Sequence, residues 1–162
     1  MRPFLKIAHR GYSSRYPENT ILAFAKAVEA GADMIELDVH LSRDGRLVVI
    51  HDDRIDRTSD GTGWVAGLTL AELKRFNYIN GMAEHGFAGI PTLDEVIAWA
   101  PGGVTFNVEI KNRPIPAPGI ERKLADLLQE TRFADRVIVS SFDHCAIAEM
   151  KRIAGSVRTA ML

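Results

Sequence analysis

The sequence predicts an α/β fold in which successive strand–helix units form a parallel sheet. Short apolar runs of strand length alternate along the chain with longer segments whose apolar residues recur at helical spacing. This alternation is typical of βαβ units and therefore of parallel strands. Two of the predicted strands are also polar on one face and apolar on the other. In a β/α barrel the apolar face packs against helices, and the polar face points into the barrel.

Six segments have the composition of strands, and four longer helices are expected among them. The strands span residues 5–9, 34–41, 47–51, 104–111, 137–141 and 158–162. The helices run from Asn19 or Thr20 to Gly31, from Thr92 to Pro101, onward from Pro118, and from Asp143 to about Gly155. Thr92 and Glu95 form a capping box, and Asp143 is a favourable N-terminal cap. We therefore predict residues 1–162 to be a single domain.

Residues 53–91 interrupt the alternation and are predicted to be an insertion after the third strand. They are rich in glycine and contain a short helix signal at Thr69 and Glu72. We expect this insertion at the rim of the sheet, where loops carry function. Trp64 and Phe87 within it have two interpretations: they form a small core, which we favour, or they line a ligand pocket.

The composition excludes several classes of function. The chain has 20 basic and 21 acidic side chains, a formal net charge of −1, which does not favour binding to nucleic acid or to an anionic membrane. No apolar run approaches the ~20 residues that span a bilayer, and the N-terminus does not resemble a signal peptide. The single cysteine, Cys145, fits a reducing compartment. We expect a cytoplasmic protein with a small water-soluble partner and leave its oligomeric state open.

Carboxylates gather on the polar faces of two predicted strands. Glu36 and Asp38 alternate with apolar residues in segment 34–41, and Glu109 does so in segment 104–111. Such alternation also describes an antiparallel strand with one face in water, but the expected helices cover the faces of this sheet. Buried carboxylates need compensation, which a hard divalent cation, either Mg²⁺ or Ca²⁺, would supply.

Two histidines, His9 and His51, close predicted strands. Either one alone is more often structural, but two at carboxyl ends of strands favour a site, because barrel active sites form at that rim. Imidazoles titrate near neutrality, so one can accept a proton while the other donates one. Arg10 follows His9, and its planar guanidinium suits a phosphate.

Nearby polar residues are expected to have lesser roles. His40 shares the acidic face of its strand, and we expect it to form hydrogen bonds rather than to bind the cation. Asp52 and Asp53 are expected to shape the turn that leaves the strand. His85 and His144 are expected at the surface.

Five short segments together resemble the glycerophosphodiester phosphodiesterase family. They are His9-Arg10-Gly11, Pro17-Glu18-Asn19-Thr20, Glu36-Leu37-Asp38-Val39, His51-Asp52 and Val108-Glu109-Ile110-Lys111. Each is weak alone, but their order and spacing are specific. The resemblance runs from Ile7 to about Phe142 and includes the insertion.

The resemblance implies a (β/α)8 barrel of the TIM type whose enzymes release an alcohol and glycerol 3-phosphate from deacylated phospholipids. The implied roles are His9 and His51 as the acid–base pair, Glu36, Asp38 and Glu109 as metal ligands, Arg10 and Lys111 on the phosphate, and Glu18 and Asn19 as their supports. The nucleophile is either water or a neighbouring substrate hydroxyl.

The chain is short for this fold, because a closed barrel takes about 250 residues and rarely fewer than 200. We therefore expect a barrel truncated after about six strands, as in a segment of a longer protein, and the activity of this piece alone is open. Two alternatives remain: a phospholipase-D-like or other small-phosphodiester hydrolase, and a non-catalytic module that binds phosphate or metal.

Overall fold

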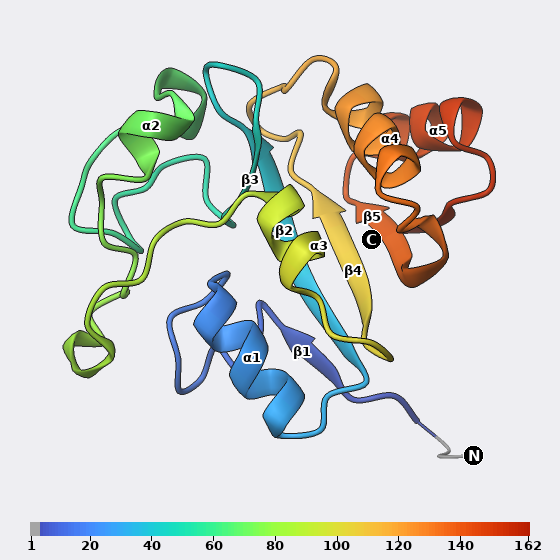
Figure 1. The fold of residues 1–162 in the computed structure, drawn as a ribbon. Helices are drawn as coiled ribbons and strands as arrows, with labels where there is room; N and C mark the ends of the chain where they lie inside the picture. Colours follow the sequence, from blue (N-terminus) through green and yellow to red (C-terminus); the bar gives the residue numbers. More distant parts are fainter. Residues whose placement is uncertain (1–3) are drawn as a thin grey trace.

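The computed structural model describes residues 4–162 and shows a six-stranded sheet packed against helices (Figure 1). The strands are β1 (Ile7–His9), β2 (Met34–Leu41), β3 (Leu47–Val49), β4 (Thr105–Ile110), β5 (Val137–Ser141) and β6 (Arg158–Met161). The helices are α1 (Ile21–Glu29), α2 (Leu70–Leu73), α3 (Leu93–Trp99), α4 (Ile120–Glu130) and α5 (His144–Ile153), with short 3₁₀ turns η1 (Val65–Gly67), η2 (Ala83–His85) and η3 (Ala134–Arg136). All six predicted strands and all four predicted longer helices are present.

Three of the four longer helices, α1, α3 and α5, begin at caps that the sequence offered. Thr20, not Asn19, caps α1, and its side chain accepts a hydrogen bond from a backbone N–H of the first turn. Thr92 and Glu95 form the reciprocal capping box of α3. Asp143 caps α5 with its side chain, which accepts a hydrogen bond from the Cys145 backbone N–H. Local sequence therefore determines where these helices start.

The strand β3 differs from the prediction of an all-parallel sheet. It runs antiparallel to β2, with Val39 opposite Val49 and Leu41 opposite Leu47. Only a short turn containing Asp44-Gly45 connects the two strands, whereas a parallel crossover needs about a dozen residues. The parallel part of the sheet therefore has five strands, not six, in the order β1-β2-β4-β5-β6.

The main core lies between the apolar face of the sheet and helices α1, α3, α4 and α5. Phe24 of α1, Leu124 of α4 and Met150 of α5 are fully buried against it. The described strands form an arc with open edges at β1 and β6, so Ile7 is 54% exposed and Met161 is 67% exposed. This arrangement is a partial barrel of the expected TIM type.

The segment 53–91 packs around a second apolar cluster, which it shares with β3. Its buried members are Val48, Ile50, Ile55, Val65, Leu73, Tyr78 and Ile90. Trp64 and Phe87 are 47% and 67% exposed, so the favoured interpretation that they form this core is wrong. Aliphatic side chains and the ring of Tyr78 fill the small volume instead.

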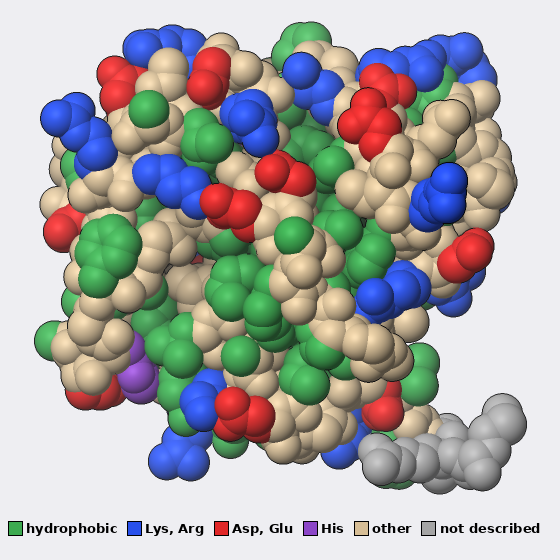
Figure 2. All heavy atoms as spheres, viewed as in Figure 1, with side chains coloured by type: hydrophobic (Ala, Val, Ile, Leu, Met, Phe, Trp, Pro, Cys, Tyr) green, Lys and Arg blue, Asp and Glu red, His purple; other side chains and the backbone are tan. Residues whose placement is uncertain are grey.

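The face seen in Figure 2 carries charged side chains of both signs around a central apolar area near α3. None of the helices within residues 4–162 combines the length and the hydropathy required to cross a membrane.

Candidate active site

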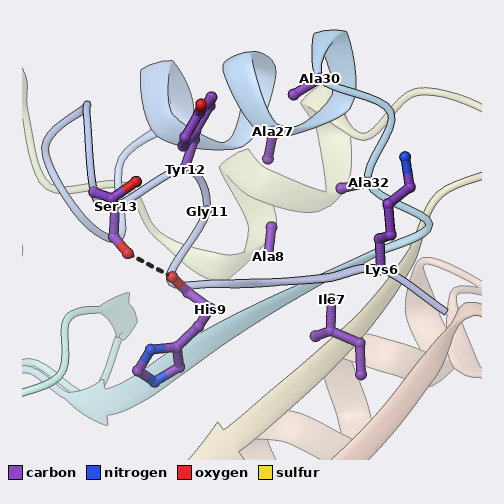
Figure 3. A pocket seen from close by; sticks show the side chains of 11 residues that line it. Lys6, Ile7, Ala8, His9, Gly11, Tyr12, Ser13, Ala27, Ala30 and Ala32 are labelled. Atoms are coloured by element: carbon purple, nitrogen blue, oxygen red, sulfur yellow. Dashed lines mark hydrogen bonds between the residues drawn. The ribbon is translucent and has the colours of Figure 1, made fainter.

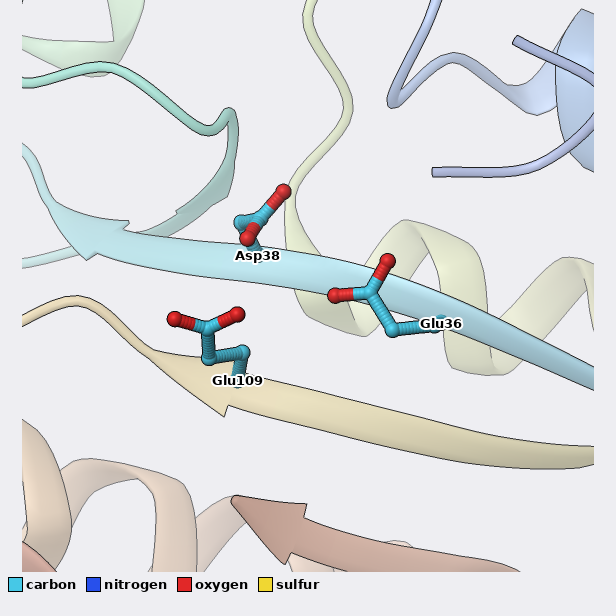
Figure 4. Close-up of side chains that lie close together, drawn as sticks. All are labelled: Glu36, Asp38 and Glu109. Atoms are coloured by element: carbon cyan, nitrogen blue, oxygen red, sulfur yellow. The ribbon is translucent and has the colours of Figure 1, made fainter. Parts of the chain in front are cut away.

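Three carboxylates meet on the polar face of the sheet (Figure 4). Glu36 and Asp38 come from β2 and Glu109 comes from β4, and the strand register places Asp38 directly opposite Glu109. Each residue offers one oxygen, and these atoms lie within 4.8 Å of one another. All three residues are buried, with 6%, 0% and 7% exposure. The cluster predicted from the alternation of two strands is therefore present.

Cationic and amide groups partly compensate the charge of Asp38. Lys111 Nζ lies 3.1 Å from Asp38 Oδ1 and 2.5 Å from Glu109 Oε1. Arg10 Nε lies 3.5 Å from Asp38 Oδ2, and Asn19 Nδ2 donates to the same oxygen at 2.9 Å. Asn19 reaches this position from a left-handed backbone conformation with φ of 56°. The two predicted phosphate ligands thus already point at the acidic cluster.

Glu36 is the least compensated member of the cluster. Its Oε2 accepts a hydrogen bond from the Arg10 backbone at 2.9 Å, but its buried Oε1 has no hydrogen-bond partner among the described residues. Burial, with the charges of Asp38 and Glu109 adding to it, raises the pKa of Glu36 to about 7. An unpaired buried carboxylate oxygen within a group of three carboxylates fits a divalent cation bound through oxygen.

The raised pKa of Glu36 predicts how the metal-free protein responds to pH. Its carboxyl group holds a proton more tightly in the folded state than in the unfolded chain, where the pKa is about 4.5. Unfolding free energy should therefore fall as pH rises from about 4.5 to 7, by an amount on the order of 3 kcal/mol. Urea unfolding in a chelator between pH 5 and pH 8 measures this slope.

The variant Glu36→Gln is the control for that experiment, because it keeps the shape of the side chain and removes its titration. Burial lowers the pKa of His40, which gives stability an opposite slope in both proteins. The difference between wild type and Glu36→Gln isolates Glu36. A difference that stays constant across the pH series would contradict the assignment.

His51 is held by its neighbour in the sequence. Its Nδ1 lies 2.7 Å from Asp52 Oδ1. The Arg57 guanidinium lowers the pKa of Asp52 to about 2, so this carboxylate is ionised and can only accept. His51 Nδ1 therefore donates the hydrogen bond, and Nε2 is left as the proton acceptor. Asp52 was predicted only to shape the turn, and its role in orienting His51 was missed.

His9 lies beside Glu36, with 3.8 Å between its Nε2 and Glu36 Oε2. Its side chain is 67% exposed. Figure 3 shows the side chains of Ile7 and His9 on one side of β1, while Ala8 points to α1 on the other. Ser13 Oγ donates to the His9 carbonyl at 2.8 Å and fixes the turn that follows the strand.

Arg10 and Glu18 complete the set of predicted residues. Arg10 Nη1 donates to Glu18 Oε1 at 3.1 Å. Burial raises the pKa of Glu18, but Arg57 and Arg10 outweigh it and the net shift is downward. Arg57 also contacts Asp52, and it was not identified from the sequence. The HDxxxxR spacing from His51 to Arg57 was the available signal, but a loop has no periodicity that shows where its side chains point.

The predictions for His40 and His144 agree with the structure, whereas the prediction for His85 does not. His40 lies with Nε2 3.0 Å from the His51 carbonyl, which confirms the predicted hydrogen-bonding role. His144 is exposed, as expected. His85 is partly buried rather than superficial, because its ring packs on Tyr16 and contacts the Arg15 carbonyl.

The chain is similar in sequence to known phosphodiesterases. Residues 9–162 match the model of the glycerophosphoryl diester phosphodiesterase family. A glycerophosphodiester phosphodiesterase of Caldanaerobacter subterraneus subsp. tengcongensis is 48% identical over 98% of this chain and 66% of its own length. A glycerophosphodiester phosphodiesterase of Bacillus altitudinis is 42% identical over 96% of this chain and 64% of its own length. The chain thus spans less than two thirds of the length of these relatives.

Solved structures of phosphodiesterases also superpose closely on this chain. A glycerophosphodiester phosphodiesterase of Agrobacterium tumefaciens superposes with a TM-score of 0.86 at 32% identity, over 96% of this chain and 66% of that protein. An Oleispira antarctica phosphodiesterase in complex with the product sn-glycerol-3-phosphate superposes with a TM-score of 0.84 at 32% identity. This match covers 98% of the present chain and 65% of the other.

Proposed function

Because the chain belongs to the glycerophosphoryl diester phosphodiesterase family, we propose that it hydrolyses glycerophosphodiesters to an alcohol and glycerol 3-phosphate with a divalent cation. The observation that carries this proposal is the cluster of three buried carboxylates, with His9 Nε2 3.8 Å from Glu36 Oε2. His51 directly follows Ile50, whose backbone N–H donates to the Asp38 carbonyl at 3.1 Å. The sn-glycerol-3-phosphate product bound to the Oleispira antarctica relative supports the same product here.

The cationic side chains are assigned to the phosphate. Lys111 and Arg10 lie at the edge of the carboxylate cluster, with 14% and 19% of their side chains exposed. From there they can bind the non-bridging oxygens, whose negative charge grows in the transition state. A Mg²⁺ or Ca²⁺ ion held by Glu36, Asp38 and Glu109 would supply further neutralisation of that charge.

The two histidines are assigned to proton transfer. One removes the proton from the nucleophile, either water or a neighbouring substrate hydroxyl, and the other gives a proton to the leaving alkoxide. The tautomer of His51 supports this assignment, because its Nε2 is left free to accept a proton while Nδ1 contacts Asp52. His9 reaches the same cluster from β1 beside Glu36.

Turnover is expected to depend on the cation and on a water-soluble substrate. Glycerophosphocholine supplied with Mg²⁺ or Ca²⁺ should yield glycerol 3-phosphate, measured enzymatically over time. Removing the cation with a chelator should abolish turnover, because the buried carboxylates then repel the phosphate. Restoring the cation should restore the rate.

Vesicles of phosphatidylcholine, assayed beside glycerophosphocholine, test the phospholipase-D-like alternative. We expect no choline release from the vesicles. Cleavage of vesicles alone, or equal cleavage in the presence of the chelator, would contradict the proposal. Cation binding without turnover of any diester would instead favour a non-catalytic module.

A further inference from the structure

One guanidinium joins two parts of the candidate site. Arg57 Nη1 and Nη2 donate to the two oxygens of Glu18, each at 2.8 Å. Arg57 Nε donates to Asp52 Oδ2 at 2.7 Å, and Nη2 also contacts Asp52 Oδ1 at 3.1 Å. Four donated hydrogen bonds thus connect Arg57 to two carboxylates from different loops, which is the planar fork geometry that favours arginine over lysine.

Each of these carboxylates holds a residue to which the proposed reaction assigns a role. Asp52 accepts from His51 Nδ1 at 2.7 Å, and Glu18 accepts from Arg10 at 3.1 Å. His51 comes from the segment after β3, whereas Arg10 comes from the turn after β1. Arg57 is therefore the link through which these two loops share one hydrogen-bond network.

We infer that Arg57 is a positioning residue: through Asp52 it fixes the ring of His51, and through Glu18 it fixes the guanidinium of Arg10. This inference rests on the proposed function, in which His51 transfers a proton and Arg10 binds the phosphate of the same diester. His51 and Arg10 must then stay at a fixed distance from each other, because a small displacement of a reacting or binding group lowers the rate strongly.

The alternative is that Arg57 forms ordinary surface ion pairs. Its side chain is 43% exposed, and exposed ion pairs contribute little to folding stability. The two interpretations therefore predict different results. A surface ion pair predicts almost no change in any property, whereas a positioning role predicts a large change in turnover with a small change in stability.

The inference also predicts what the loss of Arg57 does to His51. Without this guanidinium, Asp52 has no other described partner to hold its carboxylate against the imidazole. The ring then exchanges between its two tautomers and orientations, so only part of the molecules present Nε2 as the acceptor. Glu18 also loses its hydrogen bonds to Arg57, so it no longer holds the guanidinium of Arg10 in one position.

Arg54 provides a matched control in the same loop. Its side chain is also 43% exposed, and it also donates two hydrogen bonds to a carboxylate, that of Asp56. Arg54 also stacks on the Trp64 ring, 4.8 Å from its centroid, and no described contact joins Arg54 or Asp56 to the residues assigned to the reaction. Arg54→Gln thus removes an equivalent charge and ion pair without disturbing the network that contains Arg57.

The experiment compares Arg57→Gln, Arg57→Lys and Arg54→Gln with wild type in the presence of the cation. We measure kcat and KM for glycerophosphocholine, the tautomer of His51 by ¹⁵N NMR of the imidazole nitrogens, and unfolding in urea. For Arg57→Gln we expect kcat to fall by about 10–100-fold, as for other losses of an orienting hydrogen-bond partner. The His51 signals should shift from the Nδ1–H tautomer to a mixture.

Arg57→Lys should recover only part of the loss in kcat, because an ammonium group cannot bind both carboxylates in bidentate fashion. Arg54→Gln should match wild type in kcat, in KM and in the His51 tautomer, with only a small change in unfolding from the lost contact with Trp64. Unchanged kcat and an unchanged His51 tautomer in Arg57→Gln would overturn the inference, as would an equal loss in Arg54→Gln. The NMR readout needs no substrate, so it tests Arg57 even if wild type fails to hydrolyse the diester, a result that contradicts the proposed function alone.

Discussion

Replacement of His51 by alanine is expected to lower kcat for glycerophosphocholine by about 10²–10⁴-fold, the usual contribution of proton transfer by a positioned side chain. Cation affinity should stay nearly unchanged, because no described contact joins the His51 ring to the three carboxylates. Steady-state kinetics measures the first quantity and isothermal titration with Mg²⁺ or Ca²⁺ measures the second. His9→Ala should lose activity in the same range.

His144→Ala is the control for both variants, because His144 is an exposed histidine outside the site. It should keep wild-type kcat. Normal turnover in His51→Ala or in His9→Ala would remove that residue from the acid–base pair. A loss of cation binding equal to the loss of rate would show that the histidine supports the metal site instead.

The variant Asp38→Asn is expected to lower both the cation affinity and the stability of the protein. Cation affinity should fall at least about 100-fold, since even an outer hydrogen-bond partner of a metal site is worth 10–100-fold. The unfolding free energy of the metal-free protein should fall on the order of 3 kcal/mol, because Arg10 and Lys111 lose a fully buried partner. Titration calorimetry and urea unfolding in a chelator measure the two effects.

The stability effect of Asp38→Asn should be opposite in sign to that of Glu36→Gln at pH 8. Glu36 is unpaired at one oxygen, so its neutralisation relieves repulsion, whereas Asp38 is paired with two cations. Glu29→Gln, which removes an exposed ion pair with Lys26, should change stability very little. Wild-type cation affinity in Asp38→Asn would contradict the assignment of the carboxylate cluster.

Strand periodicity was enough to predict the carboxylate cluster. Successive side chains of a strand point to opposite faces, so Glu36 and Asp38 had to share a face whatever the rest of the fold did. Glu109 followed from the same rule on a second strand. The expected parallel pairing of these strands then brought the three residues together, and the register with Asp38 opposite Glu109 agrees.

The direction of β3 was predictable from the sequence but was predicted wrongly. The rhythm of strand and helix favoured a parallel strand, yet the turn at Asp44-Gly45 is too short for a crossover. The consequence is limited, because His51 still follows the strand and reaches the site. The short connection between β2 and β3 decides their antiparallel pairing, although strands and helices alternate elsewhere in the chain.

The sequence by itself determined the chemical inventory of this protein: the strands, the helix caps, the acidic face and the two histidines at strand ends. These features depend on short-range geometry, which is fixed within a few residues. Only the tertiary structure decided that Arg57 contacts Glu18 and Asp52, since residues 18 and 57 lie in separate loops. It also decided the raised pKa of Glu36, because burial and neighbouring charge are properties of the packed molecule.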